Sequence, residues 1–157
     1  MAHDTEKLRE LLERVEAASG PDREIDFDLI STFDEGSYAA REIESFRRWE
    51  GEKMISEGGP HYWGISYWRE NFSSSCPIIK LTASLDASIA LVERMLPGHG
   101  WSVNDYSGVK SGVGCFIHSP ARCFHETGKT APLAVLATLL SALISQAEGE
   151  AQHGPRA

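Results

Sequence analysis

The sequence predicts an α+β domain, and two periodic patterns of apolar residues support this prediction. In three segments the apolar residues recur at the spacing of one helix face, and in several others they alternate as in a strand. Elements of these two kinds pack in layers around a common core. We therefore expect a single-domain α-β-α sandwich, in which helices cover a mixed, mostly antiparallel sheet of about four to five strands.

Three helices are expected at residues 5–18, 85–96 and 131–147. Ser84 and Thr130 are suited to be the N-caps of the second and third helices, because their hydroxyl oxygens can accept free backbone N–H groups. Residues 133–144 are apolar except for Thr138 and Ser141. An apolar stretch of this length is too short to span a membrane, so it predicts a buried helix.

Strands are expected at residues 61–69, 101–106, 112–118 and 121–127, with turns at residues 107–108 and 119–120. Residues 25–33 alternate polar and apolar side chains and suit a short strand or an extended segment. Residues 39–55 are charged and favour a helix, and the polar residues 73–77 favour a loop.

If residues 119–120 form the turn of a hairpin, His118 pairs with Ala121. One face of the hairpin then carries Cys115, Ile117, Arg122 and Phe124, and the other carries Phe116, His118, Cys123 and His125. Because both faces include apolar side chains, we expect each to be at least partly covered.

A chain of 157 residues suits one domain with a hydrophobic core. We expect this domain to cover residues 1–148, with an aromatic-rich insert at about residues 31–79. Residues 149–157 are expected to form a disordered tail.

Charge and composition argue against nucleic-acid binding, membrane insertion, secretion and a disulfide framework. The 23 acidic and 15 basic residues give a net charge of −8, which disfavours binding to duplex nucleic acid. No stretch is apolar enough to predict a membrane span, and the first residues are too charged for a signal peptide. Three cysteines cannot form a complete disulfide framework, so reduced thiols in the cytoplasm are expected.

Three blocks of sequence carry a resemblance to a known family. They are LRELLERVEAASGPDREID from Leu8, TASLDASIALVERMLPGHGWSV from Thr82 and KTAPLAVLATLLSALISQA from Lys129. Together they resemble the phage ABA-sandwich domain family, which comprises small proteins of bacteriophages and prophages. The resemblance implies strands sandwiched between helices and a phage or prophage source, but no activity. The chain departs most from the family at residues 31–79, where a specific function is expected.

Motifs of catalysis and metal binding are weak in this sequence. His118, Cys123 and His125 could share a strand face and ligate zinc, but no CxxC pair is present and a fourth ligand would have to come from elsewhere. No GxSxG, HExxH or phosphate-binding glycine loop is present. We therefore expect no catalytic residue, metal or cofactor.

The aromatic residues between positions 61 and 72 are the most suggestive functional feature. Tyr62 and Trp68 would share one strand face, and Trp63 and Tyr67 the other. An exposed ring beside a guanidinium can stack on a nucleobase and bind its phosphate, whereas buried rings would only complete the core. The candidate ligand-binding residues are Tyr62, Trp63, Tyr67, Trp68, Arg69, Arg47 and Arg122.

The primary functional hypothesis is a non-enzymatic phage or prophage accessory protein that acts by binding. Its ligand would be a small anionic, nucleotide-like signal of host defence, sequestered in the host cytoplasm. The alternative is a protein-interaction or phage assembly module whose exposed Trp and Tyr anchor a host or phage protein. An enzyme is a third option, and self-association of the chain is left open.

Overall fold

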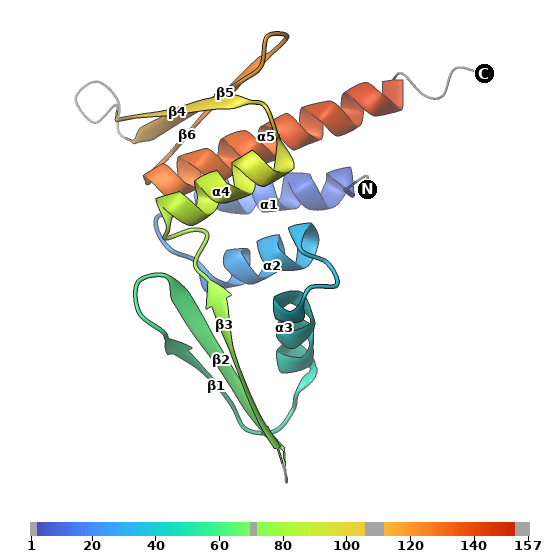
Figure 1. Ribbon diagram of the computed structural model, residues 1–157, viewed down its shortest axis with the longest axis vertical. Helices are drawn as coiled ribbons and strands as arrows, with labels where there is room; N and C mark the ends of the chain where they lie inside the picture. Colours follow the sequence, from blue (N-terminus) through green and yellow to red (C-terminus); the bar gives the residue numbers. More distant parts are fainter. Residues whose placement is uncertain (1–2, 70–71, 106–111, 153–157) are drawn as a thin grey trace. The chain divides into compact units, whose positions relative to one another are not determined.

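The computed structural model describes residues 3–69, 72–105 and 112–152, and its α+β class agrees with the sequence-based expectation (Figure 1). The chain divides into two compact units. Unit 1 combines Met1–Gly20 with Leu85–Ala157, and unit 2 consists of Pro21–Ser84. Each unit has its own three-stranded antiparallel sheet, where a single sheet of four to five strands was expected.

Unit 1 contains three helices and the sheet that we call sheet B. The helices are α1 (Thr5–Ala17), α4 (Leu85–Met95) and α5 (Ala131–Gln152), and the strands, in spatial order, are β4 (Gly100–Asp105), β5 (Val113–His118) and β6 (Cys123–Gly128). Helix α5 packs against β5 and β6, and α1 and α4 pack against α5. The three helices lie within one residue of their predicted starts, because their caps and apolar spacing are local signals.

Helix α5 forms the core of unit 1. The Leu133 backbone N–H donates to the Thr130 hydroxyl at 3.4 Å, as expected of an N-cap. Residues 132–140 are all buried. Although α5 is long and apolar enough to cross a membrane, its apolar side chains pack on the other elements of unit 1. The helix continues to Gln152, into the segment expected to be a tail, and residues 153–157 lie outside the described part of the chain.

Unit 2 contains two helices and the sheet that we call sheet A. The helices are α2 (Arg23–Phe33) and α3 (Tyr38–Arg48), and the strands, in spatial order, are β1 (Lys53–Glu57), β2 (Tyr62–Arg69) and β3 (Phe72–Ile79). Helix α3 packs against β2 and β3, and α2 packs against β3. Helices therefore cover one face of sheet A, which we call its inner face.

The expectation of a strand at residues 25–33 was wrong, because these residues form most of α2. The carboxylate of Asp22 caps the helix by accepting the Ile25 backbone N–H at 3.0 Å. The misleading alternation depended on Asp26, which looks solvent-facing in the sequence but is buried beside Ile25, Leu29 and Ile30.

Two other expectations in unit 2 were also wrong. Helix α3 ends at Arg48, and residues 53–55, expected to be helical, belong to β1. Residues 73–77, expected to be a loop, belong to β3. Pro77 is compatible with that strand because β3 is an edge strand, where one row of N–H groups has no partner strand.

The β5–β6 hairpin has a longer loop than predicted, and His118 pairs with Cys123 instead of Ala121. A shift of two residues changes the partners but preserves the faces: Phe116 lies opposite His125 and Ile117 opposite Phe124. The side chains of His118, Cys123 and His125 are exposed, whereas Phe116 on the same face is half-buried, so this face is covered in part at most. Tyr106 and the expected turn at residues 107–108 lie outside the described residues.

Candidate functional site

Strand β2 separates its aromatic side chains between the two faces of sheet A, as its alternation predicts. Ile65 and Tyr67 are buried on the inner face, and Trp63 is half-buried there. Tyr62 and Trp68 point to the opposite face and are 43% and 42% exposed. The rings of β2 thus divide into core residues and surface residues.

The surface that carries Tyr62 and Trp68 continues onto both neighbouring strands. Directly paired residues of a sheet share a face. Ser66 pairs with Met54 of β1 and with Ser75 of β3, and Gly64 pairs with Ser56 and Pro77. We call this surface the outer face of sheet A, and its described side chains are those of Met54, Ser56, Tyr62, Ser66, Trp68, Ser75, Pro77 and Ile79.

The described side chains of the outer face include no charged group. Met54 is 49% exposed, so three of the large exposed apolar side chains in the described part of the chain lie on this face. Met54 was missed in the sequence because residues 39–55 were expected to be one helix. With a strand at residues 53–57, its alternation with Ile55 would have indicated exposure.

The inner-face aromatics are held by polar contacts within unit 2. The Tyr67 hydroxyl donates to Glu42 of α3 at 3.2 Å. The Trp63 indole N–H donates to a carboxylate oxygen of Asp26 at 2.8 Å, and the Lys80 ammonium lies 4.1 Å from the centroid of the Trp63 ring. Trp63 and Tyr67 therefore serve the structure of unit 2 and do not join the outer face.

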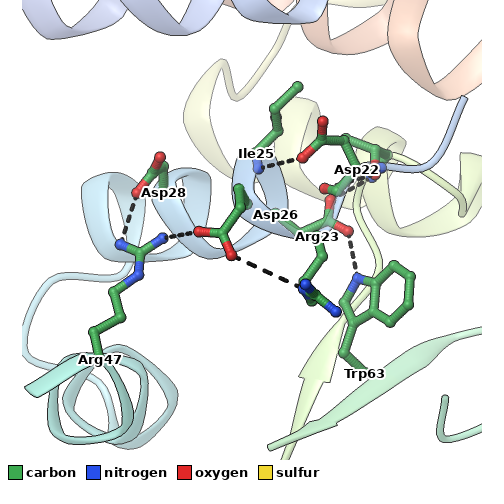
Figure 2. Close-up of polar contacts among 9 residues, drawn as sticks. Asp22, Arg23, Ile25, Asp26, Asp28, Arg47 and Trp63 are labelled. Atoms are coloured by element: carbon green, nitrogen blue, oxygen red, sulfur yellow. Dashed lines mark hydrogen bonds and ion pairs between the residues drawn. The ribbon is translucent and has the colours of Figure 1, made fainter. Parts of the chain in front are cut away.

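Asp26 joins the two ends of unit 2. One carboxylate oxygen accepts the Thr82 backbone N–H at 2.7 Å, and the other accepts the Trp63 indole N–H (Figure 2). The Thr82 hydroxyl accepts the Asp22 backbone N–H at 2.8 Å and donates to the Asp22 carbonyl. These contacts connect the beginning of α2 with the chain that follows β3, and they involve residues from two of the sequence blocks behind the phage resemblance.

Burial raises the pKa of Asp26 from 3.8 to about 6, although its hydrogen bonds from Trp63 and Thr82 oppose this shift. The negative charge of Asp22 raises it further. Because Asp26 is 0% exposed, no substrate can reach its carboxyl group in this conformation. Burial in the core of unit 2 accounts for the raised pKa, so the shift by itself does not indicate a catalytic group.

Of the arginines proposed as anion ligands, Arg47 lies on α3, in the helical layer on the inner face of sheet A, and Arg122 belongs to unit 1. The Arg47 guanidinium on α3 bridges Asp28 at 2.8 Å and Glu24 at 3.0 Å, both on α2 (Figure 2). Arg122 belongs to unit 1 and donates to the Ser145 hydroxyl. The side chain of Arg69 lies outside the described part of the structure.

Of the six predicted ligand-binding residues whose side chains the structure describes, Tyr62 and Trp68 are the two that share the outer face, near opposite ends of β2. Trp63 and Tyr67 lie on the inner face of sheet A, and Arg47 lies in the helical layer that covers this face. The arrangement is a flat, uncharged surface with exposed rings and a thioether, and no described cation lies on it.

The cysteines and histidines of sheet B were considered as metal ligands from the sequence. Among the described residues, no cluster of three or more His, Cys, Asp or Glu side chains is arranged to hold a metal ion. The His125 ring is stacked on Phe116, with 4.1 Å between the ring centroids. Burial raises the pKa of Cys76 and that of Cys115, which makes both thiols weaker nucleophiles.

We expect the cysteines to contribute packing and no chemistry. Replacing Cys76, Cys115 and Cys123 together by alanine should cost a few kcal/mol of stability at most, mainly through cavities at the two buried positions. Urea unfolding of the triple variant, with and without EDTA, measures this cost. Stoichiometric zinc in the purified protein, or unfolding on addition of EDTA, would contradict the prediction.

Comparisons of the chain with protein-family models, with curated proteins and with solved structures find no match.

Proposed function

We propose that this chain is a non-enzymatic binding protein that docks a partner protein on the outer face of sheet A. The observation that carries the proposal is the exposure of Met54, Tyr62 and Trp68 on one uncovered sheet face. Large exposed apolar side chains that share one sheet face are typical of interaction surfaces. Trp and Tyr are also the residue types most enriched among interface anchors.

The surroundings of this face indicate the chemistry of the partner. Glu50 and Glu52 are exposed just before β1, and Glu57 is exposed at its end. The whole chain carries a net charge of −8. A partner with an apolar centre and a basic rim would match this surface, because complementary charges favour encounter and orientation.

A small anionic, nucleotide-like ligand is the second candidate. It is favoured by the exposed indole of Trp68, since an accessible aromatic ring can stack on a nucleobase. The ion pairs of Arg47 with α2 and the absence of a described cation on the outer face favour a protein partner instead.

The resemblance to phage ABA-sandwich proteins supports a source and a location for this function. We propose a phage or prophage accessory protein of the host cytoplasm, whose partner is a host or phage protein. Host-defence components and virion proteins are the two classes of partner to test.

Trp68→Ala should weaken partner binding roughly 5- to 150-fold, the effect of losing an anchor worth ~1–3 kcal/mol. Because Trp68 is exposed, this substitution should leave the unfolding temperature nearly unchanged. Quantitative pull-down from infected and uninfected cells, followed by titration of the recovered partner, measures the change.

Tyr38→Ala is the matched control, because Tyr38 is an aromatic residue exposed at 59% on α3, away from the outer face. It should bind as the parent does. Titration of the parent with adenosine and guanosine phosphates, followed by tryptophan fluorescence, tests the second candidate. A partner that binds parent and Trp68→Ala equally would overturn the proposed docking face.

A further inference from the structure

Among the strands that the structure describes, β1 has a neighbour on one side only, because the spatial order of sheet A is β1-β2-β3. The Gly58 N–H donates to the Tyr62 carbonyl at 3.0 Å, and the Trp68 N–H donates to the Glu52 carbonyl at 3.1 Å. In an antiparallel ladder the residues of a strand alternate in the direction of their backbone groups. Lys53, Ile55 and Glu57 therefore direct their N–H and C=O groups to the free side of β1.

The other edge of sheet A is less suited to pair with a strand. The Lys80 N–H donates to the His61 carbonyl at 2.9 Å, so the even-numbered residues of β3 face β2 and the odd-numbered residues face outward. Pro77 is one of the outward residues, and it has no N–H to donate. Of the two edges, only β1 presents an uninterrupted row of donors and acceptors.

The sequence of β1, KMISE, is complementary to itself in one antiparallel register. With Ile55 opposite Ile55 of a second copy, Lys53 lies opposite Glu57 and Met54 opposite Ser56. Lys53, Ile55 and Glu57 lie on the same face of the strand, so each end of the paired strands would bring opposite charges together. The Ile55–Ile55 pair and the two Lys53–Glu57 pairs would each also exchange two backbone hydrogen bonds.

We propose that two copies of this chain associate through β1, with Ile55 on the two-fold axis and Lys53 paired with Glu57 of the second copy. Charged residues on an edge strand normally discourage pairing with an arbitrary strand. Here the charges match when β1 meets itself in this register, which makes a second copy the favoured occupant. Lys53 is exposed and uses one N–H for the Phe46 carbonyl, so its ammonium retains two further donors. Glu57 lies 4.0 Å from the Lys80 ammonium of its own chain, but its side chain is 77% exposed, so its carboxylate has room to accept from Lys53 of the second copy as well.

This inference goes beyond the proposed function, because it concerns the edge of sheet A and not its outer face. Pairing through β1 would join the two sheets edge to edge and leave both outer faces open. A dimer would then present two docking faces, which increases the apparent affinity for a multivalent partner. Trp68→Ala should leave the dimer intact, so the two proposals can fail separately.

Reversal of the charges on β1 is the sharpest test. Lys53→Glu and Glu57→Lys each place like charges opposite each other and should raise the dimer dissociation constant at least about tenfold. The double variant Lys53→Glu/Glu57→Lys restores opposite charges and should recover most of the parent affinity. Sedimentation equilibrium should give the parent twice the 17.3 kDa mass of the chain. A parent that remains monomeric at millimolar concentration, or reversals without effect, would overturn the proposal.

Disulfide crosslinking tests the register independently of charge. In a Cys123→Ser background, Ile55→Cys should form a covalent dimer under mild oxidation, because paired Cα atoms about 5.5 Å apart lie within disulfide range. Met54→Cys is the matched control, since in this register it lies opposite Ser56 and not opposite itself. Equal crosslinking of both variants would refute the register, and circular dichroism of each variant confirms that it is folded.

Discussion

Leu136→Asp should prevent unit 1 from folding into a stable structure. Leu136 is 0% exposed in the middle of α5, the helix on which α1, α4, β5 and β6 pack. The substitution removes apolar packing worth ~2–5 kcal/mol and buries a carboxyl group without a partner, which costs several kcal/mol more. Together these losses approach the total stability of a typical domain. Soluble yield and urea unfolding measure the effect.

Leu140→Asp should act in the same way, because Leu140 is also 0% exposed on α5. Gln146→Asp introduces the same side chain at an exposed position of this helix and should change stability by about 0.5 kcal/mol or less. Near-parental unfolding of both leucine variants would contradict the assignment of α5 as the core helix. Loss of folding in Gln146→Asp would show that the effect of the leucine variants is not specific to buried positions.

The sequence was sufficient to locate helices whose signals are local. Thr130 and the apolar run after it define α5, and Ser84 precedes α4, because caps and periodicity act within a few residues. The faces of β2 and of the β5–β6 hairpin were also predicted, since alternation alone decides which side chains share a face.

The assignment of strands to sheets could not be predicted in the same way. Alternation does not indicate which strands pair with one another. The sequence was therefore equally compatible with one sheet and with the two sheets that the structure shows. Residues 31–79 were recognised as a distinct segment, but the compact unit begins earlier, at Pro21. The missing information was the contact of Asp22 and Asp26 with Thr82, which joins residues far apart in the sequence.

The sequence predicted only those features of the candidate site that depend on local patterns. Exposure of Tyr62 and Trp68 follows from alternation, but the partners of an arginine depend on tertiary structure. Arg47 was grouped with the rings because it is a cation, and the fold instead pairs it with Glu24 and Asp28 across two helices. The alternation of residues 25–33 did not indicate that Asp26 is buried, because a carboxyl group is rarely buried.

The stability of unit 2 should decrease as the pH rises through the range in which Asp26 ionises. The pKa of this carboxyl group is raised from 3.8 to about 6 in the folded state, so the folded protein holds the proton more tightly than the unfolded chain does. The stabilisation that protonated Asp26 provides is therefore fully present below pH ~4 and lost by about pH 7. A pKa shift of this size corresponds to a change of roughly 3 kcal/mol in the free energy of unfolding.

Asp26→Asn isolates this effect, because asparagine has a similar shape and does not titrate. Between about pH 4 and pH 8 the free energy of unfolding of the variant should rise by roughly 3 kcal/mol relative to that of the parent, whatever their difference at either end. Three of the four tryptophans, Trp49, Trp63 and Trp68, lie in unit 2, so urea unfolding followed by fluorescence reports mainly on this unit. Asp22→Asn is the control, since it retains the titration of Asp26 and removes only a neighbouring charge. A relative change of the opposite sign would mean that the hydrogen bonds from Trp63 and Thr82 outweigh burial, and that Asp26 is ionised throughout this range.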